Sequence, residues 1–311
     1  MMKPYSLPTC VLRSFLSLVL ILTSLWTSEV IADNRNVVII NSNSNIPKYQ
    51  RPQQAFEKEQ SYHVNTINLA DKQLNTKQIK YSLQQSDIIY AIGANAYQLV
   101  TEMTVDKPMV FSTAINWKRL PERANTYGVS NELPAGRQLM MYRYLFPDLK
   151  KIGIIYSPQM NKEWLEEAID TSKDVGIEII SEAIEESDEL EPILESLLGK
   201  VDALWLISDS AIASKNTILK IFNTSKKMQK PVFAYHEVFV GLGALLVISA
   251  DIPTISQQVI SLMDDVLKNK TIDKAVVFPA GSHVILNMKA LKQSPLRLNE
   301  TALDSVNKIV E

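Results

Sequence analysis

Cysteine is almost absent from this sequence, which has only Cys10 among its 311 residues. A lone cysteine cannot form a disulfide within the chain, and it cannot supply the paired thiolates of a structural zinc site. Cys10 also precedes the apolar stretch near the N-terminus, whereas the lipid-bearing cysteine of a bacterial lipoprotein would follow such a stretch. The fold must therefore be held together by its hydrophobic core.

Apolar runs long enough to span a bilayer are also missing. The N-terminal run, residues 14–26, falls well short of the roughly 20 residues that a transmembrane helix needs. It follows Lys3 and Arg13 and precedes the small-residue stretch Val30–Ala32, which is the pattern of a secretory signal peptide. An uncleaved membrane anchor is the alternative. We expect residues 1–32 to be a cleaved signal peptide and the mature chain, then free of cysteine, to be periplasmic.

Motifs of common enzyme chemistries are missing as well. The sequence has no G-x-S-x-G elbow, no Walker A loop and no H-E-x-x-H pair. Its three histidines, His63, His236 and His283, share no metal-ligand spacing. His236 stands beside Glu237, but adjacent residues of a strand or loop point apart, so a polar loop is favoured over a catalytic base. We expect no catalytic residue, no metal and no cofactor.

Charge is evenly balanced along the chain, with a formal net charge of −2. Nucleic-acid binding calls for a basic stripe, so no nucleic-acid partner is expected. The densest charge run, Glu182–Glu191, is interpreted as a solvated loop and helix start rather than as a cation or partner site.

What the sequence does contain is a regular alternation of short apolar runs and helical patterns. Unbroken apolar strands separated by helices predict parallel strands that are covered on both faces. Two such series, divided near residues 126–134, predict an α/β fold with two Rossmann-like lobes. The expected strands are 37–40, 87–92, 108–111, 151–156, 178–180, 203–207 and 231–234, and the expected helices are 49–60, one from residue 95, 163–175, 190–199 and 211–228.

Small polar residues follow the expected strands in both halves. Ligands of open α/β sheets bind at this carboxyl edge, so the pattern predicts a binding cleft between the lobes. Taken singly, each segment could equally be an ordinary helix cap. Gly93–Ala96 opens a helix and would offer free amides to a carboxylate or another anion. The segments are Asn41–Asn45, Gly93–Ala96, Ser112–Asn116, Ser157–Asn161, Ser208–Ser210 and Tyr235–Glu237.

A series of motifs supports a more specific interpretation through its order. The motifs are Asp87–Ala96 with Lys107–Phe111, Tyr127–Ser130, Leu145–Tyr156, Val201–Trp205 with Ser208–Ser210, Pro231–Glu237 followed by Gly243–Leu245, and the tail from Asn287 to Val310. In these motifs the chain resembles the bacterial ABC-transporter substrate-binding proteins of the type I periplasmic-binding fold. The resemblance is to the branch that includes tryptophan- and other aromatic amino-acid-binding proteins, and it covers nearly the whole mature chain.

The resemblance implies two lobes joined by three crossings near residues 129–131, 237–239 and 268–274. It implies that lobe 1 comprises 33–130 and 238–272, that lobe 2 comprises 131–237 and 273–290, and that 291–311 form a helical tail. The family's ligand contacts map onto Ser44, Gly93, Ala94, Asn95, Ser112, Thr113, Ala114, Ser157, Asn161, Ser208, Asp209, Ser210 and Glu237. Relatives often carry a small or acidic residue at Tyr235, so the ligand could differ from theirs.

The resemblance also implies a mechanism of capture and delivery. A monomer would bind a small solute, favourably an amino-acid-like one, close by a hinge motion and dock on an ABC permease. Glu237 and Asp209 would bind an amine, and the amides of Gly93–Asn95 would bind a carboxylate. Tyr235, Phe239, Tyr156 or Trp117 could supply an aromatic wall, with core packing as the alternative for each.

Other interpretations remain open at this point. Glu237 could be a solvated hinge residue instead of a ligand contact. The whole protein could serve a signalling system by handing its closed form to a receptor. An enzyme on the same scaffold is a further alternative, although the sequence offers no nucleophile–base pair.

Overall fold

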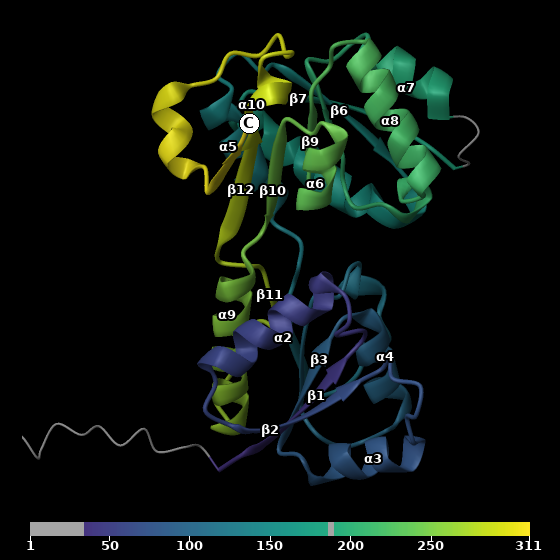
Figure 1. The fold of residues 1–311 in the computed structure, drawn as a ribbon, viewed down its shortest axis with the longest axis vertical. Coiled ribbons are helices and arrows are strands. Elements are labelled where there is room, and N and C mark those ends of the chain that lie inside the picture. The colour runs from purple at the N-terminus through teal and green to yellow at the C-terminus, as the bar shows by residue number, and fades with distance from the viewer. Residues whose placement is uncertain (1–33, 186–189) are drawn as a thin grey trace, which may run out of the picture.

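The computed structural model describes residues 34–185 and 190–311. The chain forms two lobes, at the bottom and top of Figure 1, joined by a narrow set of crossing segments. The expected signal peptide, residues 1–32, lies outside the described residues, as does the centre of the charge run at 186–189. None of the helices in the described ranges is both long and apolar enough to cross a membrane.

The first lobe is built on a six-stranded sheet with the order β11-β5-β4-β3-β1-β2. All of its strand pairs are parallel. The strands are β1 (Asn36–Asn41), β2 (His63–Asn68), β3 (Ile88–Ile92), β4 (Met109–Ser112), β5 (Thr126–Val129) and β11 (Val276–Val277). The helices are α2 (Pro47–Glu59), α3 (Thr76–Gln85), α4 (Ala94–Glu102) and α9 (Ile252–Leu267), with the 3-10 turn η2 (Trp117–Arg119).

The strands β1, β3 and β4 of this sheet are largely apolar and buried on both faces, and helices cover both faces. In β1, Val37 and Ile39 pack in a cluster with residues of α2 and α9. The alternate residues Val38 and Ile40 pack in a second cluster with residues of α3 and α4. This is the arrangement that an unbroken apolar run predicts.

The second lobe has a seven-stranded sheet with the order β13-β12-β10-β9-β8-β6-β7. Its strands are β6 (Lys151–Tyr156), β7 (Glu178–Ala183), β8 (Ala203–Trp205), β9 (Val232–Ala234), β10 (Leu246–Ala250), β12 (Ser282–Asn287) and β13 (Lys308–Val310). Its helices are α5 (Ala135–Leu145), α6 (Pro158–Asp174), α7 (Leu190–Leu198), α8 (Lys215–Lys227) and α10 (Met288–Leu291), with the 3-10 turns η4 (Ser210–Ile212), η5 (Glu237–Leu242) and η6 (Glu300–Ser305). Residues of α5 and α6 cover one face of the sheet and those of α7 and α8 cover the other.

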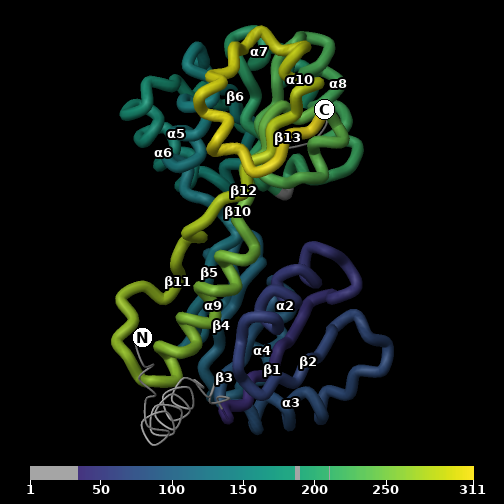
Figure 2. Tube along the Cα trace, turned by 60° about the vertical axis from the view of Figure 1, so that its left-hand side comes forward, coloured from purple at the N-terminus to yellow at the C-terminus, as the bar shows by residue number. Residues whose placement is uncertain are grey.

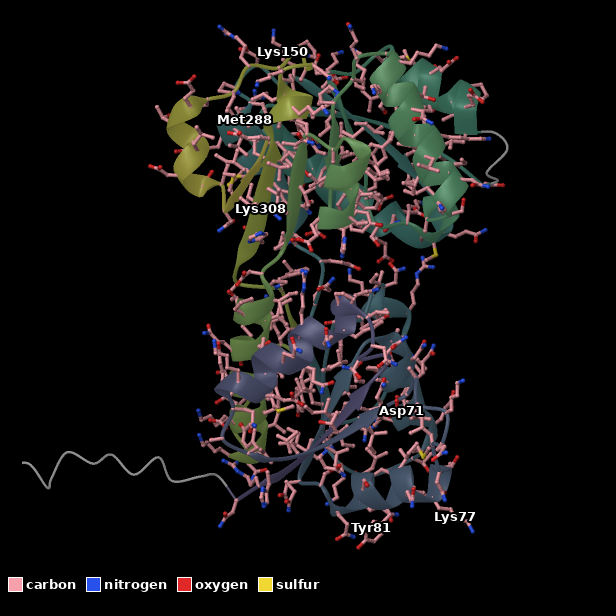
Figure 3. The ribbon with its side chains drawn as sticks, in the orientation of Figure 1. Asp71, Lys77, Tyr81, Lys150, Met288 and Lys308 are labelled. Atoms are coloured by element: carbon pink, nitrogen blue, oxygen red, sulfur yellow. The ribbon has the colours of Figure 1, made fainter. Side chains whose placement is uncertain are left out.

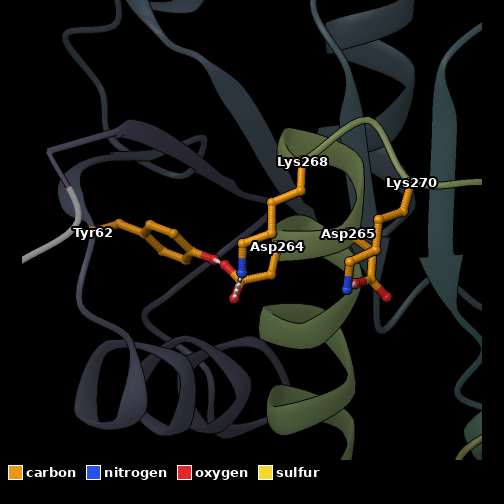
Figure 4. Close-up of polar contacts among 5 residues, drawn as sticks. All are labelled: Tyr62, Asp264, Asp265, Lys268 and Lys270. Carbon is orange, nitrogen blue, oxygen red and sulfur yellow. Dashed lines mark hydrogen bonds and ion pairs between the residues drawn. The ribbon is translucent and has the colours of Figure 1, made fainter.

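Helix α9 returns the chain from the second lobe to the first, where it packs on α2, β4 and β5. At its start the Asp251 carboxylate caps the helix by accepting a hydrogen bond from the Thr254 amide at 3.0 Å. Near its end the Tyr62 hydroxyl donates to Asp264, which also pairs with Lys268 at 3.1 Å (Figure 4). These contacts make α9 part of the first lobe.

Three segments cross between the lobes, and they run side by side in Figures 1 and 2. They connect β5 to α5, β10 to α9 and β11 to β12. The second and third crossings therefore lie at residue 251 and at 278–281, and the expected positions at 237–239 and 268–274 are wrong. The reason is that η5 continues into β10, which pairs with β9 and β12 in the second sheet.

The expected lobe boundaries change accordingly. Residues 238–250 belong to the second lobe, because β10 is a strand of its sheet, and 273–277 belong to the first, because β11 pairs with β5. Residues 291–311, expected to form a helical tail, contain the turn η6 and the strand β13, which extends the second sheet beside β12. Strand β12 is antiparallel to β10, since it enters the second lobe directly from the third crossing.

The crossings also fix which edges of the two sheets face each other. Strands β5 and β11 end where the chain leaves the first lobe, and β10 ends where it leaves the second. Parallel neighbours end at the same edge as these strands. The carboxyl edges of both sheets therefore face each other across the crossings, and the loops that follow the strands lie between the lobes.

Candidate functional site

On the first lobe the central feature between the lobes is Gly93, which links β3 to α4. Its φ of 93° is in the region that favours glycine. A Cβ at this position would lie 2.5 Å from Ser42 Oγ and 2.6 Å from Tyr49 Cε1. Only glycine lets the loops after β1 and β3 approach this closely.

Helix α4 begins directly at this close approach. The Ala96 amide donates to Ser42 Oγ at 3.1 Å, so a serine of the neighbouring loop caps the helix. Within the described ranges, the backbone amides of Ala94 and Asn95 donate to no acceptor. Ala94 is half-buried and Asn95 is exposed. Free amides at the start of a nine-residue helix suit a carboxylate or another anion.

The loop after β4 is strained and mostly buried. Ser112 Oγ shares a hydrogen bond of 2.7 Å with the buried Tyr90 hydroxyl, and burial raises the pKa of that tyrosine. Thr113 has a φ of 59° and Asn116 has a φ of 54°. Positive φ values are uncommon in residues other than glycine, and they are most unusual in a β-branched residue such as Thr113. Ser112, Thr113 and Ala114 thus lie at the expected edge, but they are buried in this structure. Strain of this kind often accompanies binding sites.

Ser44, the remaining expected contact of the first lobe, lies over the end of β2. Its backbone amide donates to Asn68 Oδ1 at 2.9 Å, and the residue is half-buried. It therefore lies at the same carboxyl edge as Gly93, two strands further towards the end of the sheet.

On the second lobe the expected residues converge on Asp209. Its carboxylate accepts hydrogen bonds from the Ser157 amide at 2.7 Å, from Asn161 Nδ2 at 2.7 Å and from the Ala211 amide at 2.9 Å. The residue is only 3% exposed. In the part of the chain that the structure describes, no lysine, arginine or histidine forms an ion pair with it. Asp209 thus fixes the starts of α6 and η4 while keeping a negative charge near the inter-lobe face. Ser210 begins η4.

Of the four aromatic residues expected to form a wall, Phe239 lies in the core, whereas Trp117, Tyr156 and Tyr235 are half-buried and each packs on a core cluster. Phe239 is buried and stacks with Phe222, with ring centroids 5.9 Å apart, so it belongs to the core. Trp117 and Tyr156 are half-buried and pack on the core clusters of their own lobes. Tyr235 is half-buried and lies edge-on to Phe239 at 5.2 Å. Burial raises the pKa of Tyr235, and a hydrogen bond with the Ser208 side chain opposes this change.

Glu237 is already paired, and its partner lies on the other lobe. Arg51 Nη1 of α2 donates to Glu237 Oε1 at 2.8 Å, with the two side chains 55% and 40% exposed. This hydrogen bond lowers the pKa of Glu237. A second arginine of the first lobe, Arg119 of η2, reaches the Gln159 carbonyl and the Met160 sulfur of α6. Two arginines therefore bridge the lobes.

Ser42, Arg51 and Arg119 are not among the site residues that the sequence predicted. Ser42 lies inside the expected segment Asn41–Asn45, but the pattern of that segment does not tell which serine turns inwards. The arginines carry no local signal, because each is an ordinary charged residue on an exposed helical turn. Their partners lie 186 and about 40 residues away along the chain.

A surface hollow at the far end of the first lobe is lined by α3 and the loop before it, near Asp71, Lys77 and Tyr81 (Figure 3). It lies away from the inter-lobe face. Across the described residues, no group of three or more histidine, cysteine or acidic side chains could hold a metal ion.

Comparison with known proteins agrees with this architecture. A family model described as "ABC transporter substrate binding protein" matches residues 54–310. A relative named "Tyrosine-binding protein", from Clostridioides difficile strain R20291, is 28% identical over 241 residues, which cover 74% of this chain and 68% of that one.

Two solved structures have the same fold at low sequence identity. A ligand-free, open substrate-binding protein with adhesive properties from Clostridium difficile has a TM-score of 0.69 and 17% identity, covering 89% of this chain and 99% of that one. The L-Trp complex of an ABC domain from Streptococcus pneumoniae has a TM-score of 0.60 and 20% identity, covering 89% and 100%. The fold is thus that of the type I periplasmic-binding proteins, and the chain belongs to the family of ABC transporter substrate-binding proteins.

Proposed function

We propose that this protein captures an amino-acid-like small molecule, with an aromatic L-amino acid favoured, between its two lobes and delivers it to an ABC permease. The observation that supports this most directly is the complementary chemistry of the two facing edges. The first lobe offers the free amides of Ala94 and Asn95, and the second lobe offers carboxylates. An amino acid carries the two charges that these edges would accept.

The aromatic preference is supported by the relatives and by one side chain. The curated relative is named a tyrosine-binding protein, and one structure of the same fold was solved with L-Trp. In this chain Tyr235 lies half-buried among the polar residues of the second lobe, where its ring could pack on an aromatic ligand. Ring packing of this kind favours an aromatic over an aliphatic side chain.

Delivery to a permease requires that the protein act outside the cytoplasm. The N-terminal pattern, with Lys3 and Arg13 before a short apolar run, supports export with removal of residues 1–32. The intact mass of the exported protein tests this. We expect a chain that begins at Asp33 and carries no lipid, and a mass that includes residues 1–32 would contradict the proposal.

Ligand binding can be tested with the exported protein by thermal unfolding and calorimetry. We expect L-tyrosine, L-tryptophan or L-phenylalanine to stabilise it, because a ligand of the native state at a hundredfold excess over its Kd adds about 2.7 kcal/mol. That corresponds to a rise in Tm of a few degrees for a protein of this size. L-Alanine and L-glutamate serve as controls that differ only in the side chain. If no aromatic amino acid raised the Tm at millimolar concentration, the proposed ligand class would be wrong.

A further inference from the structure

The ion pair between Arg51 and Glu237 joins the two lobes at the site proposed for the ligand. Arg51 lies in α2, which follows the loop after β1, and Glu237 begins η5 directly after β9. Both side chains therefore stand at carboxyl edges that face each other. Their contact of 2.8 Å is a direct hydrogen bond between opposite charges.

The charged groups around this pair are basic on the first lobe and mainly acidic on the second, where Lys308 of β13 is a positive charge close to Glu237. Desolvation lowers the pKa of His236 and the charge of Glu237 opposes this change, while Lys48 and Arg51 of α2 bring positive charge close to the histidine and lower its pKa further. Tyr49, between them in sequence, contacts the Gly93 position where α4 and its free amides begin. On the second lobe, Glu237 and the buried Asp209 supply negative charge. The first lobe thus presents cations and amide donors, and the second presents carboxylates.

The exposure of the pair means that it can be exchanged at low cost. Both side chains are substantially solvent-accessible, at 55% and 40%. Exposed ion pairs contribute little to stability, since water and salt screen the attraction and the side chains lose freedom. A ligand that offered each partner an equivalent charge would therefore displace the contact readily.

We propose that the ligand is a zwitterion that inserts between Arg51 and Glu237 and exchanges partners with them. This rests on the proposed function. The ligand's α-carboxylate takes the place of Glu237 on the Arg51 guanidinium, and its α-ammonium takes the place of Arg51 on the Glu237 carboxylate. The fork of an arginine suits a carboxylate in particular, because it can donate two parallel hydrogen bonds.

Partner exchange gives the site a rule for selecting ligands. When the lobes close, both side chains lose water, and an unpaired charge in such a place is strongly disfavoured. An amine without a carboxylate would leave Arg51 unpaired, and an acid without an amine would leave Glu237 unpaired. The site should therefore favour α-amino acids over amines and acids that carry the same ring.

Three molecules with one ring test this rule: L-tyrosine, tyramine, which lacks the carboxylate, and desaminotyrosine, which lacks the amine. Their affinities are measured calorimetrically for the exported protein and for Arg51→Gln and Glu237→Gln. We expect each variant to bind L-tyrosine about thirtyfold more weakly than the wild type, as for a closed charge pair that loses one partner. Arg51→Gln should bind tyramine with an affinity within about threefold of that of the wild type. Glu237→Gln should bind desaminotyrosine with an affinity within about threefold of that of the wild type.

Two controls keep the result interpretable. Lys58→Gln removes an equal charge from the far end of α2 and should change no affinity. Thermal unfolding without ligand checks that each variant is folded, and Arg51→Lys with Glu237→Asp provide milder changes that keep the charges. If the variants bound all three ligands more weakly to the same extent, or bound all of them as tightly as the wild type, partner exchange would be overturned while the proposed function remained intact. Failure of the wild type to bind L-tyrosine, L-tryptophan or L-phenylalanine would instead overturn the proposed function.

Discussion

At the scale of single residues, several polar side chains expected to contact the ligand hold the protein in shape. The Ser112 hydroxyl shares a hydrogen bond with the hydroxyl of the buried Tyr90. The Asp209 carboxylate accepts hydrogen bonds from three N–H groups at the starts of α6 and η4. Such residues set the positions of the loops that carry the free amides and the exposed charges. A polar residue after a strand can serve either purpose, because the direction of its side chain depends on contacts far away in the sequence.

The Ser42 hydroxyl gives a test at this scale. It accepts the Ala96 amide at 3.1 Å in a buried position, so Ser42→Ala leaves that amide without a partner. We expect a loss of about 1–2 kcal/mol in the free energy of unfolding, measured by urea titration. Ser44→Ala is the matched control, because Ser44 uses its backbone amide, which the substitution keeps. Equal stability of the two variants would show that Ser42 does not cap α4.

At the scale of elements, local pattern predicted β1, β3, β4, β6, β7, β8 and β9 but not the largely buried strands β10 and β12. The expected strand 151–156 coincides with β6, and 87–92 differs from β3 by a single residue. Strand β2 was missed because it lies at the edge of the sheet and reads His-Val-Asn-Thr-Ile-Asn, with three of its residues exposed to solvent. Edge strands need not be apolar on both faces, so their sequences resemble loops.

The assignment of elements to lobes could not be predicted in the same way. Strand β10, residues 246–250, would be equally apolar in either sheet, and its place is decided by pairing with β9 and β12. The C-terminal residues 308–310 form a strand only because β12 offers a free edge. Both outcomes depend on contacts between distant segments, about which a local pattern carries no information.

The third crossing, residues 278–281, gives a test at the scale of elements, because it forms hydrogen bonds with a helix of each lobe. From the first lobe, Gln258 of α9 accepts the Ala280 amide at 2.9 Å and donates to the Phe278 carbonyl at 3.0 Å. From the second lobe, Arg137 of α5 donates to the Pro279 and Ala280 carbonyls at 2.7 and 2.9 Å. The segment therefore bends between two fixed points.

Gln258→Ala should remove the hydrogen bonds between the third crossing and α9. We expect faster amide hydrogen exchange at Ala280, with overall stability changed by no more than about 1 kcal/mol, because the contacts are near the surface. Gln257→Ala, the exposed neighbour on the same helix, is the control. If exchange at Ala280 were the same in both variants, the crossing would not depend on its contact with α9.

At the scale of the whole molecule, the two lobes share little packing with each other. Each has its own pair of core clusters, and the extensive packing among described helices and strands lies within one lobe or the other. Between the lobes the structure describes three crossings and the two arginine bridges. Motion about the crossings would therefore disturb little buried surface, which is the basis of a hinge.

Closure about this hinge can be measured as a distance between spin labels. In a chain with Cys10→Ser, labels on Lys58→Cys in the first lobe and Lys226→Cys in the second report the distance between lobes, and both sites are exposed. We expect a saturating aromatic amino acid to shorten this distance and narrow its distribution, because ligand contacts on both edges favour one closed arrangement. Labels on Lys58→Cys and Lys80→Cys, both in the first lobe, should report an unchanged distance, since its two core clusters move as a unit. A ligand that bound with calorimetric heat but left the distance between lobes unchanged would contradict hinge closure and would place binding on one lobe alone.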